Sequence, residues 1–129
     1  MRFLSTLLFI LWATTAPAAS AAPQGQVILL GARWCAPCMA EYRELAKLAA
    51  VAAPDKVLLA WVDRPMPVPA PLANQVGILS PTQAYALAEK LGGEGFGLPM
   101  AVYMRDGAYC RVWKKPLTPE GLAPLRHDC

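Results

Sequence analysis

The stretch Trp34-Cys35-Ala36-Pro37-Cys38 decides the fold. Two cysteines separated by two residues, beside a tryptophan, form a pair suited to exchange electrons with the disulfide of another protein. An apolar run from Val27 to Leu30 precedes the motif, and a long amphipathic pattern from Met39 to Ala53 follows it. The motif is therefore predicted to lie between a buried strand and a helix.

The predicted helix makes Cys35 the candidate catalytic nucleophile. The N-terminus of a helix presents unpaired backbone N–H groups and the positive end of the helix dipole, and both favour a thiolate over a thiol. Cys38, one turn further along, is expected to be more shielded. It would resolve the mixed disulfide that Cys35 forms with a substrate.

The first residues have the pattern of an export signal. Arg2 supplies a positive charge, Phe3 to Trp12 are apolar, and Ala19-Ser20-Ala21 fits a cleavage site. We predict cleavage after Ala21, which makes residues 1–21 a signal peptide and the mature protein periplasmic. The apolar run is shorter than the roughly 20 residues of a membrane span, and an uncleaved anchor is the alternative.

The mature part has the length of one domain, with residues 22–26 as a short tail and residues 27–129 as the folded unit. The formal charge of +3 is small and scattered, so nucleic-acid binding is not expected. Several cations near the C-terminus are interpreted as a solvated surface, namely Arg105, Arg111, Lys114, Lys115 and Arg126.

A second strand and an extended connection follow the first helix. Val57 to Asp63 is predicted to be a buried strand parallel to the first one. Between Arg64 and Pro71 a proline stands at every second position, starting from Pro65. This spacing excludes a helix and predicts an extended surface connection, with peptide binding as the alternative.

The second half predicts a helix, a hairpin and a last helix. Ser80-Pro81-Thr82-Gln83 is typical of a helix start, and this helix should run to about Leu91. Pro99–Met104 and Ala108–Trp113 are predicted hairpin strands, and Pro119–Arg126 a helix. The predicted fold class is therefore α/β, with a central mixed four-stranded sheet and helices on both faces.

This order of elements, the Trp34-Cys35-Ala36-Pro37-Cys38 motif and Leu98-Pro99 before the hairpin resemble the thioredoxin superfamily over essentially the whole predicted mature chain. The resemblance implies a thioredoxin-like fold and disulfide exchange with protein substrates, without a cofactor; we expect a monomer. It also implies that Pro99 is cis and faces the cysteine pair, while the Leu98 backbone pairs with the substrate. Trp34, Ala36 and Pro37 would complete the substrate-binding surface.

Within the superfamily, the export signal, Glu41 and the long segment before the hairpin are most similar to the TlpA/ResA-like periplasmic branch. That branch usually has a proline two residues after the glutamate, where this chain has Arg43. The similarity implies a protein-disulfide reductase, acting in cytochrome c maturation or disulfide repair, with a membrane protein as electron donor. Ala36 and Pro37 bring no positive charge to the pair, which also favours a reductant.

Proton transfer is expected to differ from that of cytosolic thioredoxins. Those proteins carry a buried aspartate and a lysine where this chain has Leu29 and Leu59. The proton that leaves Cys38 during resolution therefore needs another acceptor. Glu41 is the nearest candidate, because a residue three positions after Cys38 lies on a similar helical face. The alternative is an ordinary solvated glutamate.

Cys110 and Cys129 lie outside the motif. The resemblance implies that the last helix returns across the sheet, so that the two cysteines can meet. A structural disulfide between them would close a loop of about 20 residues and contribute about 3 kcal/mol. Free thiols and a second redox relay are the alternatives.

Metal binding is the main competing class of function. Copper delivery in the cell envelope is the alternative function, because thioethers and the cysteine pair suit Cu(I); the candidates are Met39, Met66, Met100 and Met104. Met100 follows the expected cis Pro99 and should therefore lie near Cys35. Zinc is not expected, because a second closely spaced ligand pair is missing. Haem attachment is excluded, because Met39 stands where histidine would be needed. A redox-inactive adaptor is a third class, against which both cysteines argue.

Overall fold

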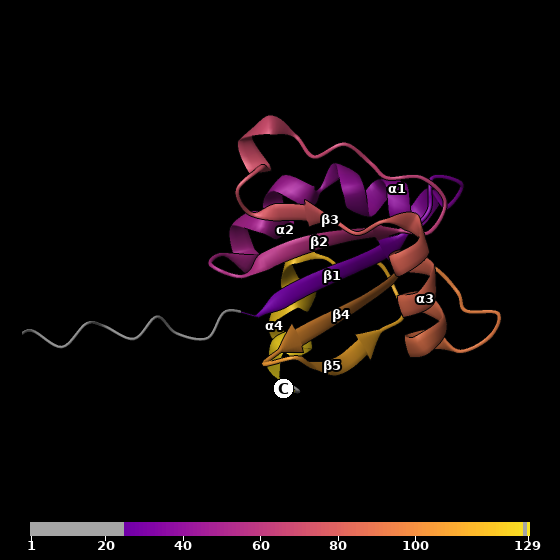
Figure 1. Ribbon diagram of the computed structural model, residues 1–129. Coiled ribbons are helices and arrows are strands. Elements are labelled where there is room, and N and C mark those ends of the chain that lie inside the picture. Colours follow the sequence, from indigo (N-terminus) through magenta and orange to yellow (C-terminus); the bar gives the residue numbers. More distant parts are fainter. Residues whose placement is uncertain (1–24, 128) are drawn as a thin grey trace, which may run out of the picture.

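The computed structural model describes residues 25–127 and 129, and its centre is a five-stranded mixed sheet in the order β3-β2-β1-β4-β5 (Figure 1). β1 (Gln26–Gly31), β2 (Lys56–Trp61) and β3 (Val76–Ile78) are parallel. β4 (Met100–Arg105) is antiparallel to β1, and β5 (Ala108–Trp113) is antiparallel to β4. The predicted signal peptide, residues 1–21, and most of the predicted tail lie outside the described residues.

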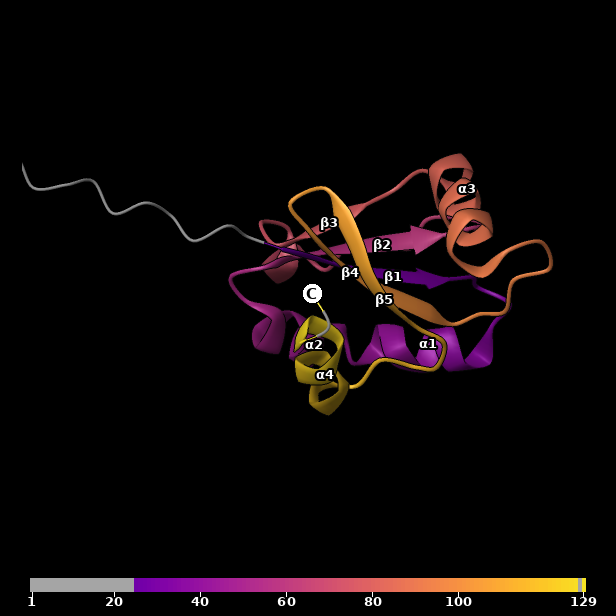
Figure 2. The same cartoon turned by 90° about the horizontal axis from the view of Figure 1, so that it is seen from below.

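Helices cover both faces of the sheet (Figure 2). α1 (Ala36–Arg43), α2 (Leu45–Ala52) and α4 (Leu122–His127) lie on one face, and α3 (Pro81–Gly92) lies on the other. Because side chains alternate along a strand, successive residues of β1 enter two separate apolar clusters. The α1 side contains both motif cysteines, and the other side is covered by α3.

The predicted fold class is confirmed, but the expected number of four strands is wrong by one. The additional strand is β3, which has three residues and pairs with β2 from Val57↔Val76 to Leu59↔Ile78. The amphipathic pattern after the motif also forms two helices instead of one, because the chain departs from helical geometry at Glu44 (φ −94°, ψ 9°).

Short sequence patterns predicted several of the other elements correctly. Ser80 caps α3 as predicted: its hydroxyl accepts from the Gln83 N–H at 3.2 Å, and the Gln83 side chain accepts from the Ser80 N–H at 3.1 Å. The proline-rich segment contains neither helix nor strand up to a short 3-10 helix at Ala70–Leu72. The predicted last helix consists of a 3-10 turn, Pro119–Gly121, followed by α4.

Candidate redox site

The two motif cysteines form a disulfide at the start of α1, with their Cα atoms 5.2 Å apart. Cys35 is the N-cap residue, and its sulfur accepts a hydrogen bond from the Cys38 N–H at 3.3 Å. Pro37 lies in the first turn, where a proline leaves no helix bond unmade. Cys35 is 5% exposed and Cys38 only 1%. Cys35 is thus the more exposed of the two residues and lies where the helix stabilises a thiolate.

The residues beside the pair are open to solvent. Trp34 is 72% exposed, so core packing is not its role. Ala36 and Pro37 are also exposed. These three residues therefore form an exposed surface next to Cys35.

Leu98-Pro99 is a cis peptide bond, as the resemblance implied. Leu30 of β1 pairs with Met100 of β4, so Leu98-Pro99 precedes β4 at the end of the sheet where the motif begins. A cavity of about 150 Å³ adjoins the bond; its lining residues are Gly92, Gly97, Leu98, Pro99, Met100 and Lys114. A second cis bond, Ala53-Pro54, was not predicted.

Met100 does not lie with the motif cysteines, contrary to the expectation that supported the copper alternative. It packs in the cluster under α3, whereas both motif cysteines lie in the cluster on the α1 side. The position after Pro99 in sequence was misleading, because alternation along β4 turns Met100 to the opposite face.

The sheet residues on the side of the cysteine pair are apolar. Leu29 and Leu59 are direct neighbours across β1 and β2, and both are buried. A Cβ on Gly31 would lie 3.4 Å from the Cys38 sulfur and 3.3 Å from the Trp61 ring, so glycine lets the indole approach this sulfur. The sequence analysis did not identify Trp61 as a residue near the cysteine pair. The available signal was a tryptophan at the end of the strand that pairs with the strand before the motif.

Glu41 is buried, not solvated, with 7% of its surface exposed. Its carboxylate accepts a hydrogen bond from the Leu117 N–H at 2.5 Å. Burial raises the pKa of Glu41 from 4.5 to about 7, and the bond from Leu117 opposes part of this increase. A cavity of about 190 Å³ adjoins the carboxylate; it is lined by Ala40, Glu41, Glu44, Pro116, Leu117, Thr118 and Pro119.

The second disulfide joins Cys110 to Cys129, with Cα atoms 5.2 Å apart. Cys110 lies near the start of β5, beside the hairpin that follows β4. That end of the sheet is the one at which β1 begins, opposite the motif. The bridge therefore lies away from Cys35, as a staple would.

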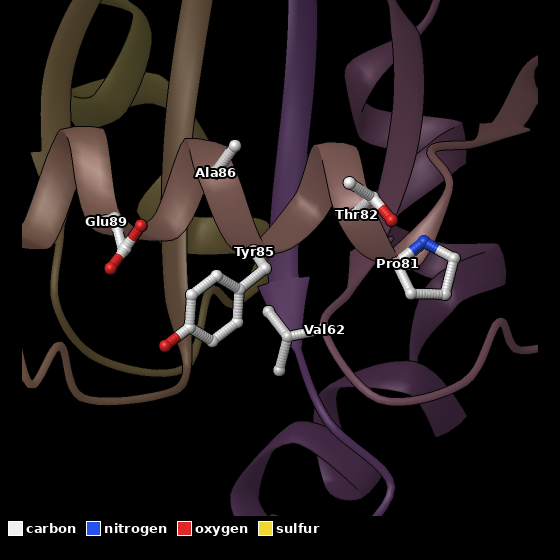
Figure 3. A pocket seen from close by; sticks show the side chains of 6 residues that line it. All are labelled: Val62, Pro81, Thr82, Tyr85, Ala86 and Glu89. Carbon is white, nitrogen blue, oxygen red and sulfur yellow. The ribbon is translucent and has the colours of Figure 1, made fainter.

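A cavity of about 430 Å³ lies along the outer face of α3. Figure 3 shows Tyr85 of α3 beside Val62, which follows β2. The lining contains no cysteine or histidine; it consists of Val62, Pro81, Thr82, Tyr85, Ala86 and Glu89.

Two further features concern residues 25–127 and 129. No helix there has the length and apolar character needed to cross a membrane. Within the same residues, no three or more histidine, cysteine, aspartate or glutamate side chains are grouped so as to hold a metal ion.

Comparison with known proteins identifies the fold. A thiol:disulfide interchange protein of the thioredoxin family from Chlorobium tepidum TLS superposes with a TM-score of 0.58 and 17% identity, covering 81% of this chain and 79% of that one. The exposed lipoprotein thioredoxin of Streptococcus pneumoniae strain TIGR4 gives 0.56 and 16%, covering 81% and 85%. A thioredoxin-related protein of Neisseria meningitidis serogroup B gives 0.55 and 14%, covering 82% and 84%. No protein-family model and no curated protein matches the chain. The fold is thioredoxin-like, and it carries a Cys-x-x-Cys pair.

Proposed function

We propose that this chain is an exported thiol-disulfide oxidoreductase that reduces protein disulfides through Cys35 and Cys38. The observation that carries the proposal is the position of the pair: a disulfide at the N-terminus of α1, in which Cys35 is slightly more exposed than Cys38. The exposed Trp34-Ala36-Pro37 surface supports substrate contact at Cys35, and the Leu98 backbone would pair with the substrate chain.

The reduced pair would donate two electrons in two steps. The Cys35 thiolate attacks one sulfur of the substrate disulfide, forms a mixed disulfide and releases one substrate thiolate, which takes up a proton. Cys38 then loses its proton and attacks the Cys35 sulfur. This second attack forms the Cys35–Cys38 bond present here and releases the other substrate thiolate. A dithiol electron donor must reduce the pair again.

Glu41 would accept the proton from Cys38. Its pKa of about 7 lets it exist in both protonation states near neutral pH, which a general base requires. Glu41 follows Cys38 by one helical turn, so the two residues lie on a similar face of α1.

The finer assignment rests on sequence. The export pattern in residues 1–21 supports a periplasmic protein, and the resemblance to the TlpA/ResA-like branch supports a reductase with a membrane electron donor. The Cys110–Cys129 bridge would be a structural staple in that oxidising compartment.

Expression of Cys38→Ala in the source cell tests the function. Without Cys38 the mixed disulfide at Cys35 cannot be resolved, so substrates and the electron donor should accumulate as covalent complexes that dissociate on reduction. The matched control, Cys35→Ser/Cys38→Ala, should form none. Complexes of equal amount in both variants would contradict exchange through Cys35.

A further inference from the structure

The residues between β2 and the 3-10 helix form a segment that the proposed exchange reaction does not use. We call residues 63–69 the proline strap. The strap begins where β2 ends, and Trp61 at that end is paired with Gly31, just before the motif. The strap therefore starts at the edge of the sheet that carries the cysteine pair.

Burial alternates along the proline strap. Pro65, Pro67 and Pro69 are exposed, whereas Met66 is only 8% exposed and Val68 is half-buried. Met66 belongs to the apolar cluster that contains Cys35, Cys38 and Trp61, and Val68 packs against it. The alternating prolines thus exclude a helix, while every second side chain enters or packs against the apolar cluster that contains both cysteines.

Two residues flanking the cysteines anchor the strap. The Arg33 N–H donates to the Asp63 carboxylate at 2.8 Å, and the Arg33 guanidinium donates to the Pro65 carbonyl. The Tyr42 hydroxyl donates to the Pro67 carbonyl. Met66 therefore lies between one anchor from the loop that carries Cys35 and another from the helix that carries Cys38.

Tyr42 also connects the strap to the surroundings of Cys38 through Trp61. The Tyr42 ring meets the Trp61 ring edge to face, with centroids 6.1 Å apart. Trp61 and the Cys38 sulfur both border the space left by the missing side chain of Gly31. Strap, Tyr42, Trp61 and Cys38 thus form one continuous packed region.

Given the proposed function, we propose that the proline strap is a wall of the redox site that shields Cys38 from external thiols, with Met66 as its inner face and Arg33 and Tyr42 as its positioning residues. An external thiolate that attacks the Cys35 sulfur forms the productive mixed disulfide and releases the Cys38 thiolate. Attack on the Cys38 sulfur would instead form a mixed disulfide at the buried position and release the Cys35 thiolate. The strap closes this second route and so fixes the order of the reaction.

The test measures the reactivity of Cys38 alone. In Cys35→Ser the new hydroxyl can still cap α1, and Cys38 is the free thiol while Cys110 and Cys129 remain bridged. Its alkylation rate by iodoacetamide, a neutral reagent, is compared with the rate in variants made on this background. Tyr42→Phe should raise the rate about fivefold, and Arg33→Ala/Tyr42→Phe more than tenfold, because each lost hydrogen bond favours an open strap.

Three further variants separate shielding from general loosening. Met66→Ala should raise the rate about tenfold, and Met66→Leu, which conserves volume, should leave it near that of Cys35→Ser. Tyr85→Phe is the matched control for hydroxyl removal, because Tyr85 lies on α3, on the other side of the sheet, and its rate should not change. Thermal unfolding confirms that each variant is folded. If Met66→Ala does not fold, Tyr42→Phe still tests the proposal, because it removes a single oxygen atom and leaves the ring in place.

Rates within twofold of Cys35→Ser in both folded anchor variants would overturn the proposal. Because alkylation needs no turnover, this result is independent of the proposed function. Cys38→Ala can trap substrates even if the strap does not shield, and Cys38 can be shielded even if no substrate is trapped.

Discussion

Two buried carboxylates lie at opposite ends of the sheet, and within residues 25–127 and 129 only one of them has a cation beside it. Glu41 and Asp55 are each 7% exposed. Asp55 accepts hydrogen bonds from the Gly25 N–H and the Tyr103 hydroxyl, both at 2.9 Å, and forms an ion pair with Arg126 at 3.0 Å. These partners tie β1, β4 and α4 together at the end of the sheet away from the motif.

Glu41 has a different set of contacts. It accepts a backbone hydrogen bond from Leu117, adjoins a cavity, and has a pKa raised by burial to about 7. The comparison teaches that burial alone does not define what a carboxylate does. A cation and two donors make Asp55 a structural group, whereas weak compensation leaves Glu41 able to exchange a proton near neutral pH.

Asp55→Ala should have the largest effect on stability. It removes the shared partner of Arg126, Tyr103 and Gly25, and we expect a loss of about 4 kcal/mol in the free energy of unfolding. Urea unfolding at pH 7 measures it, with the exposed Glu94→Ala as control. A loss below about 1 kcal/mol would show that the contacts of Asp55 do not stabilise the end of the sheet away from the motif.

The Cys110–Cys129 bridge closes the chain at the same end as Asp55. Cys110→Ser/Cys129→Ser should cost about 3 kcal/mol, because it frees a loop of about 20 residues in the unfolded chain. The rate of reduction of a protein disulfide by the folded variant should not change. A slowed rate at full folding would instead assign this bridge to the electron path and break the division between the two ends.

Local sequence patterns were enough to predict the cysteine pair, the capped helix α3 and the hairpin. Each depends on residues within a few positions of one another, such as Ser80 and Gln83. The same holds for the fold class, which follows from the order of such elements. β3 was missed because three residues centred on Gly77 carry too little pattern to stand out.

Long-range contacts account for what the sequence did not reveal. The burial of Glu41 depends on Leu117, 76 positions away, and the Asp55 cluster joins residues from three parts of the chain. The proline spacing predicted an extended segment, but Met66 is buried between two carbonyls that the side chains of Arg33 and Tyr42 hold. Pairings of this kind follow from the assembled fold.

Glu41→Gln should slow resolution of the mixed disulfide about a hundredfold at pH 7, since a general base is lost. Rapid-mixing fluorescence of the tryptophans would follow the step between pH 5 and 9. The wild-type rate should rise through an ionisation near the Glu41 pKa of about 7, and this rise should vanish in the variant. Glu44→Gln, an exposed neighbour paired with Lys47 at 2.7 Å, should behave as wild type. An unchanged pH profile in Glu41→Gln would remove Glu41 from the mechanism.

Glu41→Gln should also change how stability depends on pH. The pKa of Glu41 is about 7 in the folded chain and 4.5 as the ordinary value, so between these values the folded state holds more protons than the unfolded state. Stability from this group is therefore present below pH 4.5 and lost as the pH rises through 7. The full shift corresponds to roughly 3 kcal/mol.

Glutamine cannot ionise and can still accept from Leu117, although a neutral acceptor bonds more weakly. The variant should thus be more stable than wild type by about 2 kcal/mol at pH 8 and about equal to it at pH 4.5, by urea unfolding. Asp55→Asn should show the opposite sign at pH 8, because it loses the Arg126 ion pair. If both amide variants were destabilised at pH 8, the two carboxylates would be structural alike, and a gain for Glu41→Gln alone would mark it as the one held at a cost to stability.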